Sequence, residues 1–309
     1  MFNKKWRKML LSLLAVLLLF LNLEGVKASA ADYQDWMARI GDDRLISDLS
    51  IPGTHDSAAR YEKFDGTAKC QSLSLDDQLK CGVRYLDIRC RHYNNAFSIH
   101  HGCVYQHLNF DNVLTSCKNF LKKHPKETII MSVKEEYKAD KNNKSFEAQF
   151  KEYVNKNKDI WYLGDEIPKL KDVRGKIVLV RRFMTGKGSG ELGICAAGWK
   201  DNSTFSLNGG SLYVQDCYKV SDYNKKWNAV KNTLDKAAAK KDKSLYLNYS
   251  SGYKSVLGIP AIKRVKEYMN PKISSYISSH SKKARYGVIA MDFITADLAA
   301  KIINTNADF

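Results

Sequence analysis

Two histidines follow short apolar runs, at points where the chain turns. His55 follows the run 49–51 and a Pro-Gly break, and His101 ends a run that starts at residue 97. The unperturbed pKa of histidine, about 6.5, lies near neutral pH, so its ring can accept and donate protons there. These positions indicate acid–base chemistry, although a histidine after Pro-Gly could equally cap the following turn.

Other polar side chains also end apolar runs. Arg89 carries a planar guanidinium, which can form two parallel hydrogen bonds with a phosphate group. Strand alternation allows only one of His100 and His101 to face a given side. The remaining residues at such positions are Asp56, Asp87, Lys134, Glu136, Arg181, Arg182, Asp216, Tyr218 and Asp292.

The elements that must position these residues are eight β-rich runs, with helical patterns between many of them. Several runs are continuously apolar, as strands buried on both faces are. The alternation predicts one α/β domain, an irregular (β/α)8 barrel of the TIM type, whose C-terminal strand ends carry the active site. The runs are 49–51, 84–88, 97–99, 128–133, 176–180, 212–214, 245–247 and 287–291, and the helical patterns are 111–123, 223–239 and 257–269. The gap before the third run is too short for a helix, so the barrel should be irregular.

The same residues allow other interpretations. Asp56 is an ordinary helix-start residue, Asp292 could cap a strand end, and Arg181 with Arg182 could be a solvated charge pair. His55, Asp56, Asp87 and His101 are also suitable ligands for a metal ion. Seven of the eight runs end in polar groups at one rim, which favours a functional site over separate coincidences.

Residues 1–30 have the pattern of a secretory signal peptide. Four basic residues between positions 4 and 8 precede an apolar run over 10–21, and Ala28-Ser29-Ala30 fits a cleavage site. The apolar run is too short to span a membrane. We therefore expect a secreted protein that comprises residues 31–309.

The exported part carries a strong positive charge. The chain has a formal net charge of +17, and removal of residues 1–30, with five basic residues and one acidic residue, leaves +13. Such a charge favours anionic partners. The lysines are scattered and no zinc-finger or RNA-binding signature is present, so an anionic lipid interface is favoured over nucleic acid.

The exported part contains seven cysteines, at positions 70, 81, 90, 103, 117, 195 and 217. An odd number cannot pair completely within one chain. Cys90 and Cys103 lie on neighbouring candidate strands and could form a disulfide. The absence of a CxxC pattern argues against a cysteine metal site.

Seven motifs in this order resemble those of the bacterial phosphatidylinositol-specific phospholipases C. They run across almost the whole exported chain, so the resemblance is specific. It implies a distorted (β/α)8 barrel, in agreement with the strand count. The motifs are SIPGTHDS (50–57), GVRYLDIRCR (82–91), IHHG (99–102), ETIIMSVKEEY (127–137), GKIVLVRRF (175–183), VQDCY (214–218) and MDF (291–293).

The resemblance implies a role for each matching residue. His55 matches the general base, His101 the general acid, and Asp292 the carboxylate that orients the base. Asp56 and Arg89 match groups near the phosphate and the attacking hydroxyl. Hydrogen bonds to inositol hydroxyls are implied for Lys134, Arg182 and Asp216, a place beneath the inositol ring for Tyr218, and supporting roles for Glu136 and Asp87.

The implied reaction cleaves phosphatidylinositol, or the glycan-linked form that anchors proteins, into diacylglycerol and inositol 1,2-cyclic phosphate. No metal and no other cofactor is expected, because Arg89 takes the place that a metal ion occupies in calcium-dependent relatives. One alternative is a metal-dependent glycerophosphodiesterase, whose usual His-Arg-Gly strand-end motif is absent here. Another is an inactive barrel that binds lipid or glycan.

The expected partner is phosphatidylinositol in a membrane surface, and the family suggests a monomer. The segment after the first motif lacks the tryptophan that some members use at the membrane. The loop 250–260, SSGYKSVLGIP, is a candidate apolar contact through Tyr253, Val256, Leu257 and Ile259.

Overall fold

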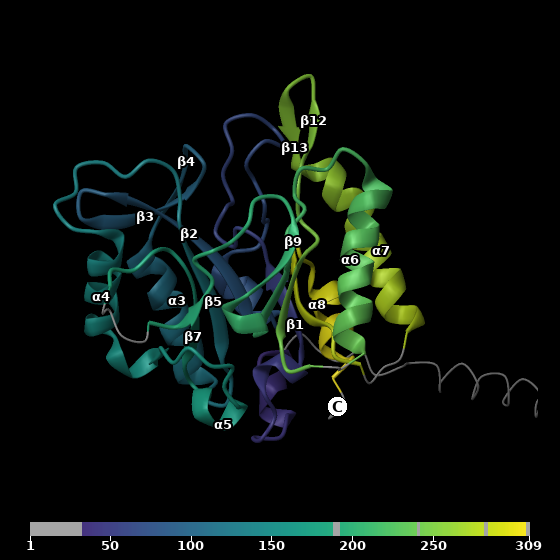
Figure 1. Cartoon of the computed structure of the whole chain (residues 1–309), viewed down its shortest axis with the longest axis horizontal. Helices are drawn as coiled ribbons and strands as arrows, with labels where there is room; N and C mark the ends of the chain where they lie inside the picture. Colours follow the sequence, from purple (N-terminus) through teal and green to yellow (C-terminus); the bar gives the residue numbers. More distant parts are fainter. Residues whose placement is uncertain (1–32, 188–191, 240–241, 281–283, 307–309) are drawn as a thin grey trace, which may run out of the picture.

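The computed structural model describes residues 33–187, 192–239, 242–280 and 284–306 (Figure 1). The expected signal peptide, residues 1–30, lies outside these ranges, so its cleavage stays a prediction. Within these ranges, no helix is long and apolar enough to cross a membrane.

The strands of the described chain form one 12-stranded sheet and a separate hairpin. The strands of the large sheet are β1 Ser50–Thr54, β2 Tyr85–Tyr93, β3 Ala96–His101, β4 Val104–Asn109, β5 Ile129–Glu135, β6 Trp161–Tyr162, β7 Ile177–Arg182, β8 Ile194–Cys195, β9 Thr204–Leu207, β10 Leu212–Gln215, β11 Leu245–Tyr249 and β14 Gly287–Met291. The hairpin consists of β12 Lys254–Val256 and β13 Ile259–Ala261.

Parallel pairing runs through most of the large sheet. The order is β6-β7-β5-β2-β1-β14-β11-β10, with parallel neighbours throughout, and β9 adds an antiparallel edge. Among the described residues, no backbone pairing joins β9 to β6 or β8. The fold is therefore an α/β, TIM-like barrel that is open on one side.

Helices cover the outside of the sheet. Figure 1 shows α3, α4 and α5 on one side and α6, α7 and α8 on the other. The helices are α2 Leu75–Lys80, α3 Phe110–Lys123, α4 Phe146–Lys156, α5 Leu170–Val173, α6 Tyr223–Ala238, α7 Ile262–Ser279 and α8 Ala296–Ile303. Every residue of β1, β11 and β14 is buried, because helices cover one face and side chains fill the other.

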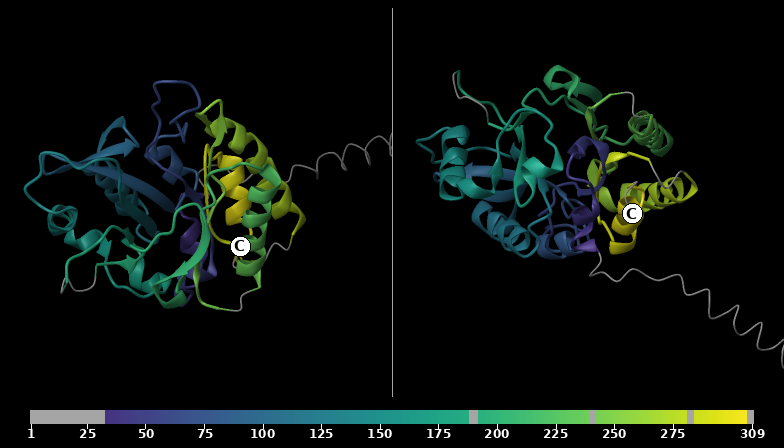
Figure 2. Two further views of the ribbon diagram at one scale, coloured as in Figure 1. Left: turned by 45° about the horizontal axis from the view of Figure 1, so that its top comes forward. Right: turned by 90° about the horizontal axis from the view of Figure 1, so that it is seen from below.

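The N-terminal segment closes the end of the barrel opposite the strand C-termini (Figure 2). Trp36 is fully buried there, and its Nε1–H donates to Gly82 O. The Arg84 guanidinium donates to Glu127 Oε2 and to the Gln34 carbonyl. This end is filled by structural contacts, so access to the barrel interior lies at the other end.

All eight β-rich runs form strands, but one of them has a different place from that expected. The run 97–99 lies in β3, which pairs antiparallel with β2. Asn94 and Asn95 both have φ of 53° and make a tight turn between β2 and β3, and parallel strands need a much longer crossover. In the parallel series β5 lies directly beside β2, and the two-residue strand β6 adds a parallel strand beside β7 at the edge of the sheet.

The helix expected at 257–269 begins later and ends later. Residues 254–261 form the β12–β13 hairpin, because Leu257 and Gly258 have φ of 51° and 82° at its turn. Helix α7 starts at Ile262 and continues through Pro271 to Ser279. The helices expected at 111–123 and 223–239 are confirmed as α3 and α6.

The proposed Cys90–Cys103 disulfide is wrong. All seven cysteines are unpaired, with Cys90 buried and Cys103 exposed. Cys90 lies on β2, facing the core, whereas Cys103 lies in the turn after β3.

Candidate active site

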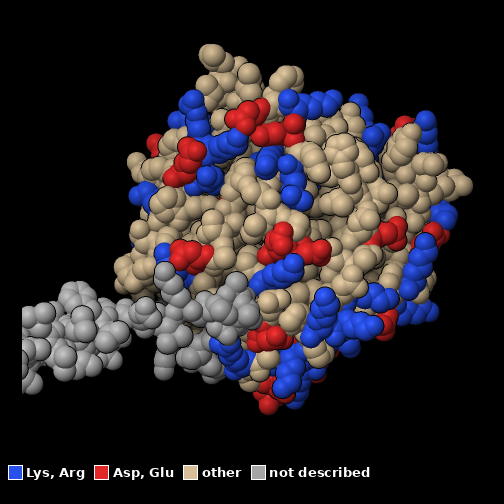
Figure 3. All heavy atoms as spheres, turned by 180° about the vertical axis from the view of Figure 1, so that it is seen from behind, with Lys and Arg blue, Asp and Glu red and all other residues tan. Residues whose placement is uncertain are grey.

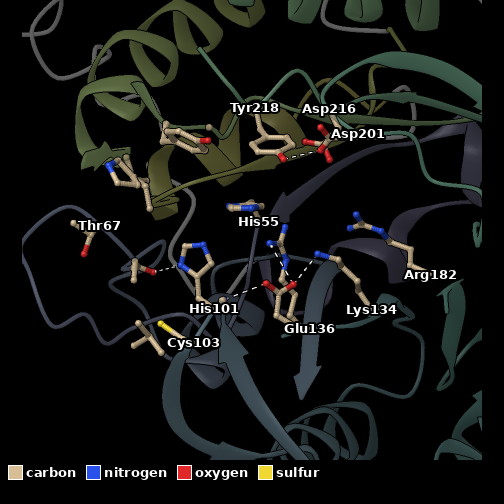
Figure 4. A pocket seen from close by; sticks show the side chains of 18 of the residues that line it. His55, Thr67, His101, Cys103, Lys134, Glu136, Arg182, Asp201, Asp216 and Tyr218 are labelled. Carbon is tan, nitrogen blue, oxygen red and sulfur yellow. Dashed lines mark hydrogen bonds and ion pairs between the residues drawn. The ribbon is translucent and has the colours of Figure 1, made fainter. Parts of the chain in front are cut away.

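A cavity of about 790 Å³ lies at the C-terminal ends of the parallel strands (Figure 4). Most of the residues expected at the site line it, namely His55, Arg89, His101, Lys134, Glu136, Arg182, Asp216 and Tyr218. The other three, Asp56, Asp87 and Asp292, are not among the residues that line the cavity, and each is at most 1% exposed. The barrel topology therefore brings together residues that lie up to 237 positions apart in the chain.

His55 follows β1, and its ring is held by a buried carboxylate. The His55 N–H donates to the Met291 carbonyl, so the pairing of β1 with β14 places His55 beside Asp292. His55 Nδ1 lies 2.8 Å from Asp292 Oδ1. With Nδ1–H donating to this carboxylate, Nε2 is the nitrogen that can accept a proton.

His101 ends β3, and its ring centroid lies 6.4 Å from that of His55. Its Nδ1–H donates to the Ala68 carbonyl at 2.7 Å. Burial, and then the charge of Arg89, lower the pKa of His101. His100 is buried on the other side of the strand, where it faces the Tyr105 and Tyr137 rings, as the alternation predicted.

Arg89 is surrounded by three carboxylates. Its Nη2 lies 3.1 Å from Asp87 Oδ2, its Nε 3.8 Å from Asp56 Oδ2 and its Nη1 3.9 Å from Glu136 Oε2. Although burial opposes the charge, Asp87 and Asp56 raise the pKa of Arg89. The site thus holds a permanent, rigidly placed cation beside the two histidines.

Asp56 and Asp87 are both fully buried, but their pKa values are shifted in opposite directions. Burial raises the pKa of Asp56 to about 7, against the opposing effect of Arg89. Neither Asp56 oxygen has a hydrogen-bond partner. Asp87 also accepts from Arg182 at 3.2 Å, and although burial opposes it, the two arginines lower the pKa of Asp87.

The cavity wall next to Arg89 carries alternating charges (Figure 4). Lys134 Nζ donates to Glu136 Oε2 at 2.7 Å. Burial, and then Arg89, lower the pKa of Lys134. Although burial opposes it, Arg89 and Lys134 lower the pKa of Glu136 to about 2. Cation and anion therefore lie side by side in this wall of the cavity.

Comparison with known proteins identifies the family to which this chain belongs. Residues 44–183 match the model "Phosphatidylinositol-specific phospholipase C, X domain". A 1-phosphatidylinositol phosphodiesterase of Staphylococcus aureus is 36% identical over 88% of this chain and 94% of its own length. The corresponding protein of Listeria monocytogenes is 32% identical over 88% of this chain and 85% of its own length.

Solved structures agree. A variant of the phosphatidylinositol-specific phospholipase C of S. aureus superposes with a TM-score of 0.80 at 36% identity, over 91% of this chain and 99% of that one. The L. monocytogenes enzyme gives 0.73 at 28% identity, over 89% and 98%. The chain belongs to the bacterial phosphatidylinositol-specific phospholipase C family. It is therefore an enzyme, a phospholipase that acts on phosphatidylinositol.

Sequence reasoning missed several residues that build the site of this phospholipase C. Trp199 lines the cavity and donates through Nε1–H to Asp216 Oδ2 at 3.0 Å. The Arg182 guanidinium stacks 3.6 Å above its ring. Asp201 accepts from the Tyr218 hydroxyl at 2.7 Å. Trp199 and Asp201 both lie in the segment between β8 and β9. This segment lacks the apolar pattern of a strand, so neither residue could be predicted to follow a strand end.

Gln71 was also missed, although it ties two strands together beside the His55–Asp292 pair. Its buried side-chain amide donates to the carbonyls of His55 and Met291, at 2.9 and 2.8 Å. Arg181, by contrast, does not reach the cavity. Its guanidinium donates to the carbonyls of Leu192 and Phe183, because alternation along β7 turns it away from Arg182.

Proposed function

We propose that this phospholipase C cleaves phosphatidylinositol through attack of the inositol 2-hydroxyl on its own phosphate. The products are diacylglycerol and inositol 1,2-cyclic phosphate. The observation that carries the proposal is the placement of His55 and His101 at 6.4 Å between ring centroids, with Arg89 lining the same cavity.

The first half of the step is deprotonation of the nucleophile. His55 Nε2 takes the proton of the 2-hydroxyl, and the oxygen forms a bond to phosphorus. Asp292 stabilises the imidazolium that results. The hydroxyl and the phosphate belong to one molecule, so the attack is intramolecular and no water has to be positioned.

The second half is departure of the diacylglycerol oxygen. The bond from phosphorus to this oxygen breaks, and protonated His101 donates its proton to it. The Ala68 carbonyl fixes the orientation of the ring through Nδ1–H, so Nε2–H is the donor. The lowered pKa of His101 makes it a stronger acid, and an anionic phosphate beside it favours the protonated form.

The positive guanidinium of Arg89 stabilises the negative charge of the phosphate. Its guanidinium is fixed by three carboxylates before substrate arrives, which avoids reorganisation during the reaction. The carboxylates that a divalent cation would need as ligands are already ion-paired with Arg89. We therefore expect full activity in excess chelator.

The alternating charges suit the inositol ring. Lys134, Arg182 and Asp216 can hydrogen-bond to its hydroxyls, with Tyr218 beneath the ring and Glu136 and Asp87 fixing the cations. This arrangement supports inositol without added phosphates, because extra phosphate would meet the acidic side chains of Glu136, Asp201 and Asp216. The glycan-linked form of the lipid fits the same headgroup site and is proposed as a further substrate. The enzyme is proposed to be a secreted monomer.

The test compares His55→Ala, His101→Ala and the double variant, assayed on phosphatidylinositol in the presence of chelator. Each single change should lower kcat by about 10²–10⁴-fold, the range for a general acid or base. The losses in the double variant should be far from additive, since the two groups act in one step. A single variant with near-normal turnover, and unchanged circular dichroism, would refute the two-histidine mechanism.

A further inference from the structure

Lys226 is a buried lysine that the reaction described above does not use. It lies on α6 and is only 3% exposed, and of the lysines that the structure describes it is the one that is buried. Lysine side chains are almost never fully buried unless their charge is compensated. The surroundings of the Lys226 ammonium should therefore contain the reason for its burial.

The hydrogen bonds of Lys226 do not supply that reason. Its Nζ donates to Tyr249 O at 2.6 Å and to Gln215 Oε1 at 3.4 Å. Both acceptors have another donor, because Tyr249 O accepts from Gln215 Nε2–H and Gln215 Oε1 accepts from the Cys217 N–H, each at 2.8 Å. An apolar side chain in place of Lys226 would leave neither oxygen unsatisfied, and it would avoid the cost of burying a charge.

The charge of Lys226 acts on a carboxylate of the cavity. Burial lowers the pKa of Lys226 to about 8, and the strongest opposing effect comes from the charge of Asp216. The ammonium is therefore mostly protonated at neutral pH. Asp216 is 7% exposed, lines the cavity and accepts a hydrogen bond from Trp199 Nε1–H. A carboxylate that is this far buried needs a counter-charge, and Lys226 supplies one.

The same contacts hold the turn that carries Asp216. Gln215 ends β10 directly before Asp216, and its side chain accepts from the N–H of Cys217 directly after it. Lys226 contacts this side chain and shares with it the acceptor Tyr249 O at the end of β11. Helix α6 is thereby attached to the ends of both strands, behind the cavity wall.

We propose that Lys226 is a positioning residue, which holds the carboxylate of Asp216 in place for the inositol ring and balances its charge from behind the cavity wall. The inference rests on the contact proposed above between Asp216 and an inositol hydroxyl. That hydroxyl does not react, so the contact stabilises the bound substrate and the transition state equally. Loss of Lys226 should therefore raise KM and leave kcat unchanged.

Lys226→Met, which keeps an extended side chain and removes its charge, is the first test. On a water-soluble inositol phosphodiester we expect KM to rise by about tenfold, equivalent to about 1.4 kcal/mol of binding free energy. The inhibition constant of myo-inositol should rise by the same factor, and the NMR signal of the Trp199 indole N–H should shift. A loss of stability with unchanged KM would show a purely structural role and would overturn the inference.

Lys225→Met is the matched control, because it removes the same charge from an exposed position on the same helix. It should leave KM unchanged, and an equal rise in KM would overturn the inference by showing an effect of net charge. Lys226→Gln keeps a hydrogen-bond donor without the charge and should behave like Lys226→Met. It also replaces that variant if Lys226→Met does not fold. Failure of both variants to fold would mean that Lys226 is structural, which overturns the inference.

Asp216→Asn separates this inference from the proposed contact with inositol. It should raise KM by itself, and adding Lys226→Met should then have little further effect, since both changes remove one contact. Raised KM in Asp216→Asn with normal KM in Lys226→Met, or fully additive effects, would overturn the inference alone. Normal KM in Asp216→Asn would refute the contact of Asp216 with inositol, and the inference with it.

Discussion

Asp56 is the residue at which the site departs most from ordinary protein structure. It is fully buried, its oxygens lack hydrogen-bond partners, and its φ of 37° lies in the left-handed region. Such strain is retained where the surrounding structure enforces it, often at functional sites. The N–H of Asp56 donates to Asp87 Oδ2 at 3.2 Å, which holds the turn in place.

Asp56→Asn should change how stability depends on pH. Burial raises the folded-state pKa of Asp56 to about 7, above the 3.8 of an exposed aspartate, so between these values the folded protein retains a proton that the unfolded chain has lost. This contribution is fully present below about pH 4 and is lost as pH rises through 7, with a slope of up to about 1.4 kcal/mol per pH unit. Asparagine tolerates the same φ and does not titrate.

Urea unfolding of both proteins between pH 4.5 and 8 measures this difference. We expect the free energy of unfolding of Asp56→Asn to fall less with rising pH than that of the wild type. Shifts common to both proteins, such as that of His101, cancel in the comparison. Parallel curves for the two proteins would show that Asp56 is ionised throughout.

The residues that could be predicted from the sequence share one property. His55, Arg89, Lys134 and Asp216 follow apolar runs that form parallel strands, and such strands bring the C-terminal ends of these runs to one place. Gln71 gave no such signal, because its position depends on a loop that returns to β1 and β14 from a distance in the sequence. Such contacts between residues far apart in the sequence can be identified only from the structure.

At the scale of elements, the segment 68–71 reaches both histidines. The Ala68 carbonyl accepts from His101 Nδ1–H, and the Gln71 amide holds the ends of the strands that carry His55 and Asp292. The segment is itself anchored, since the N–H groups of residues 70 and 71 both donate to Ala59 O. It therefore couples the positions of base and acid.

Gln71→Met tests Gln71 as a positioning residue. The side chain keeps its volume but loses two donors, each worth about 1 kcal/mol. We expect kcat to fall by about tenfold with little change in KM, and the NMR signal of the His55 Nδ1–H proton to shift. Gln71→Glu, which cannot donate to both carbonyls, should behave likewise. A change in stability with unchanged kcat and unchanged proton signal would mean that Gln71 is purely structural.

The elements themselves were largely predictable because buried parallel strands have a simple apolar pattern. The exceptions have physical causes. β6 is two residues long, which is too short to show an apolar pattern. The apolar pattern of β3 is that of a barrel strand, but the tight Asn94-Asn95 turn before it makes β3 pair antiparallel with β2. The β12–β13 turn likewise interrupts a helical pattern through left-handed backbone at Leu257.

At the scale of the whole molecule, apolar side chains surround the mouth of the cavity. Phe64 is 75% exposed, Leu257 is 99% exposed and Ile259 57%. Phe64 and Pro260 line the cavity, and Leu257 is at the tip of the neighbouring hairpin. Figure 3 shows basic and acidic side chains intermixed over one face of the molecule. Lipid binding should therefore combine local apolar contact with a diffuse positive charge.

Vesicle binding of the double variant Phe64→Ser/Leu257→Ser should be weaker than that of the wild type by roughly 3–6 kcal/mol if both side chains are fully buried in lipid, since each then contributes about 1.5–3 kcal/mol. Binding should also increase with anionic lipid and decrease with salt, because the Debye length is only about 8 Å at physiological ionic strength.

Sedimentation with vesicles at several salt concentrations measures both effects. Turnover of a water-soluble inositol phosphodiester is the control and should not change in the variant. Unaltered vesicle binding in the variant would exclude this rim as the lipid contact.

The central claim is that the inositol 2-hydroxyl is the nucleophile, and the first phosphorus product tests it most directly. Phosphorus NMR of phosphatidylinositol cleavage, recorded in excess chelator, should show inositol 1,2-cyclic phosphate first. Inositol 1-phosphate should follow only slowly, as the histidines exchange roles and water opens the ring. A lipid methylated on the 2-hydroxyl should not react. Direct formation of inositol 1-phosphate from either lipid would contradict the mechanism and favour a metal-dependent phosphodiesterase.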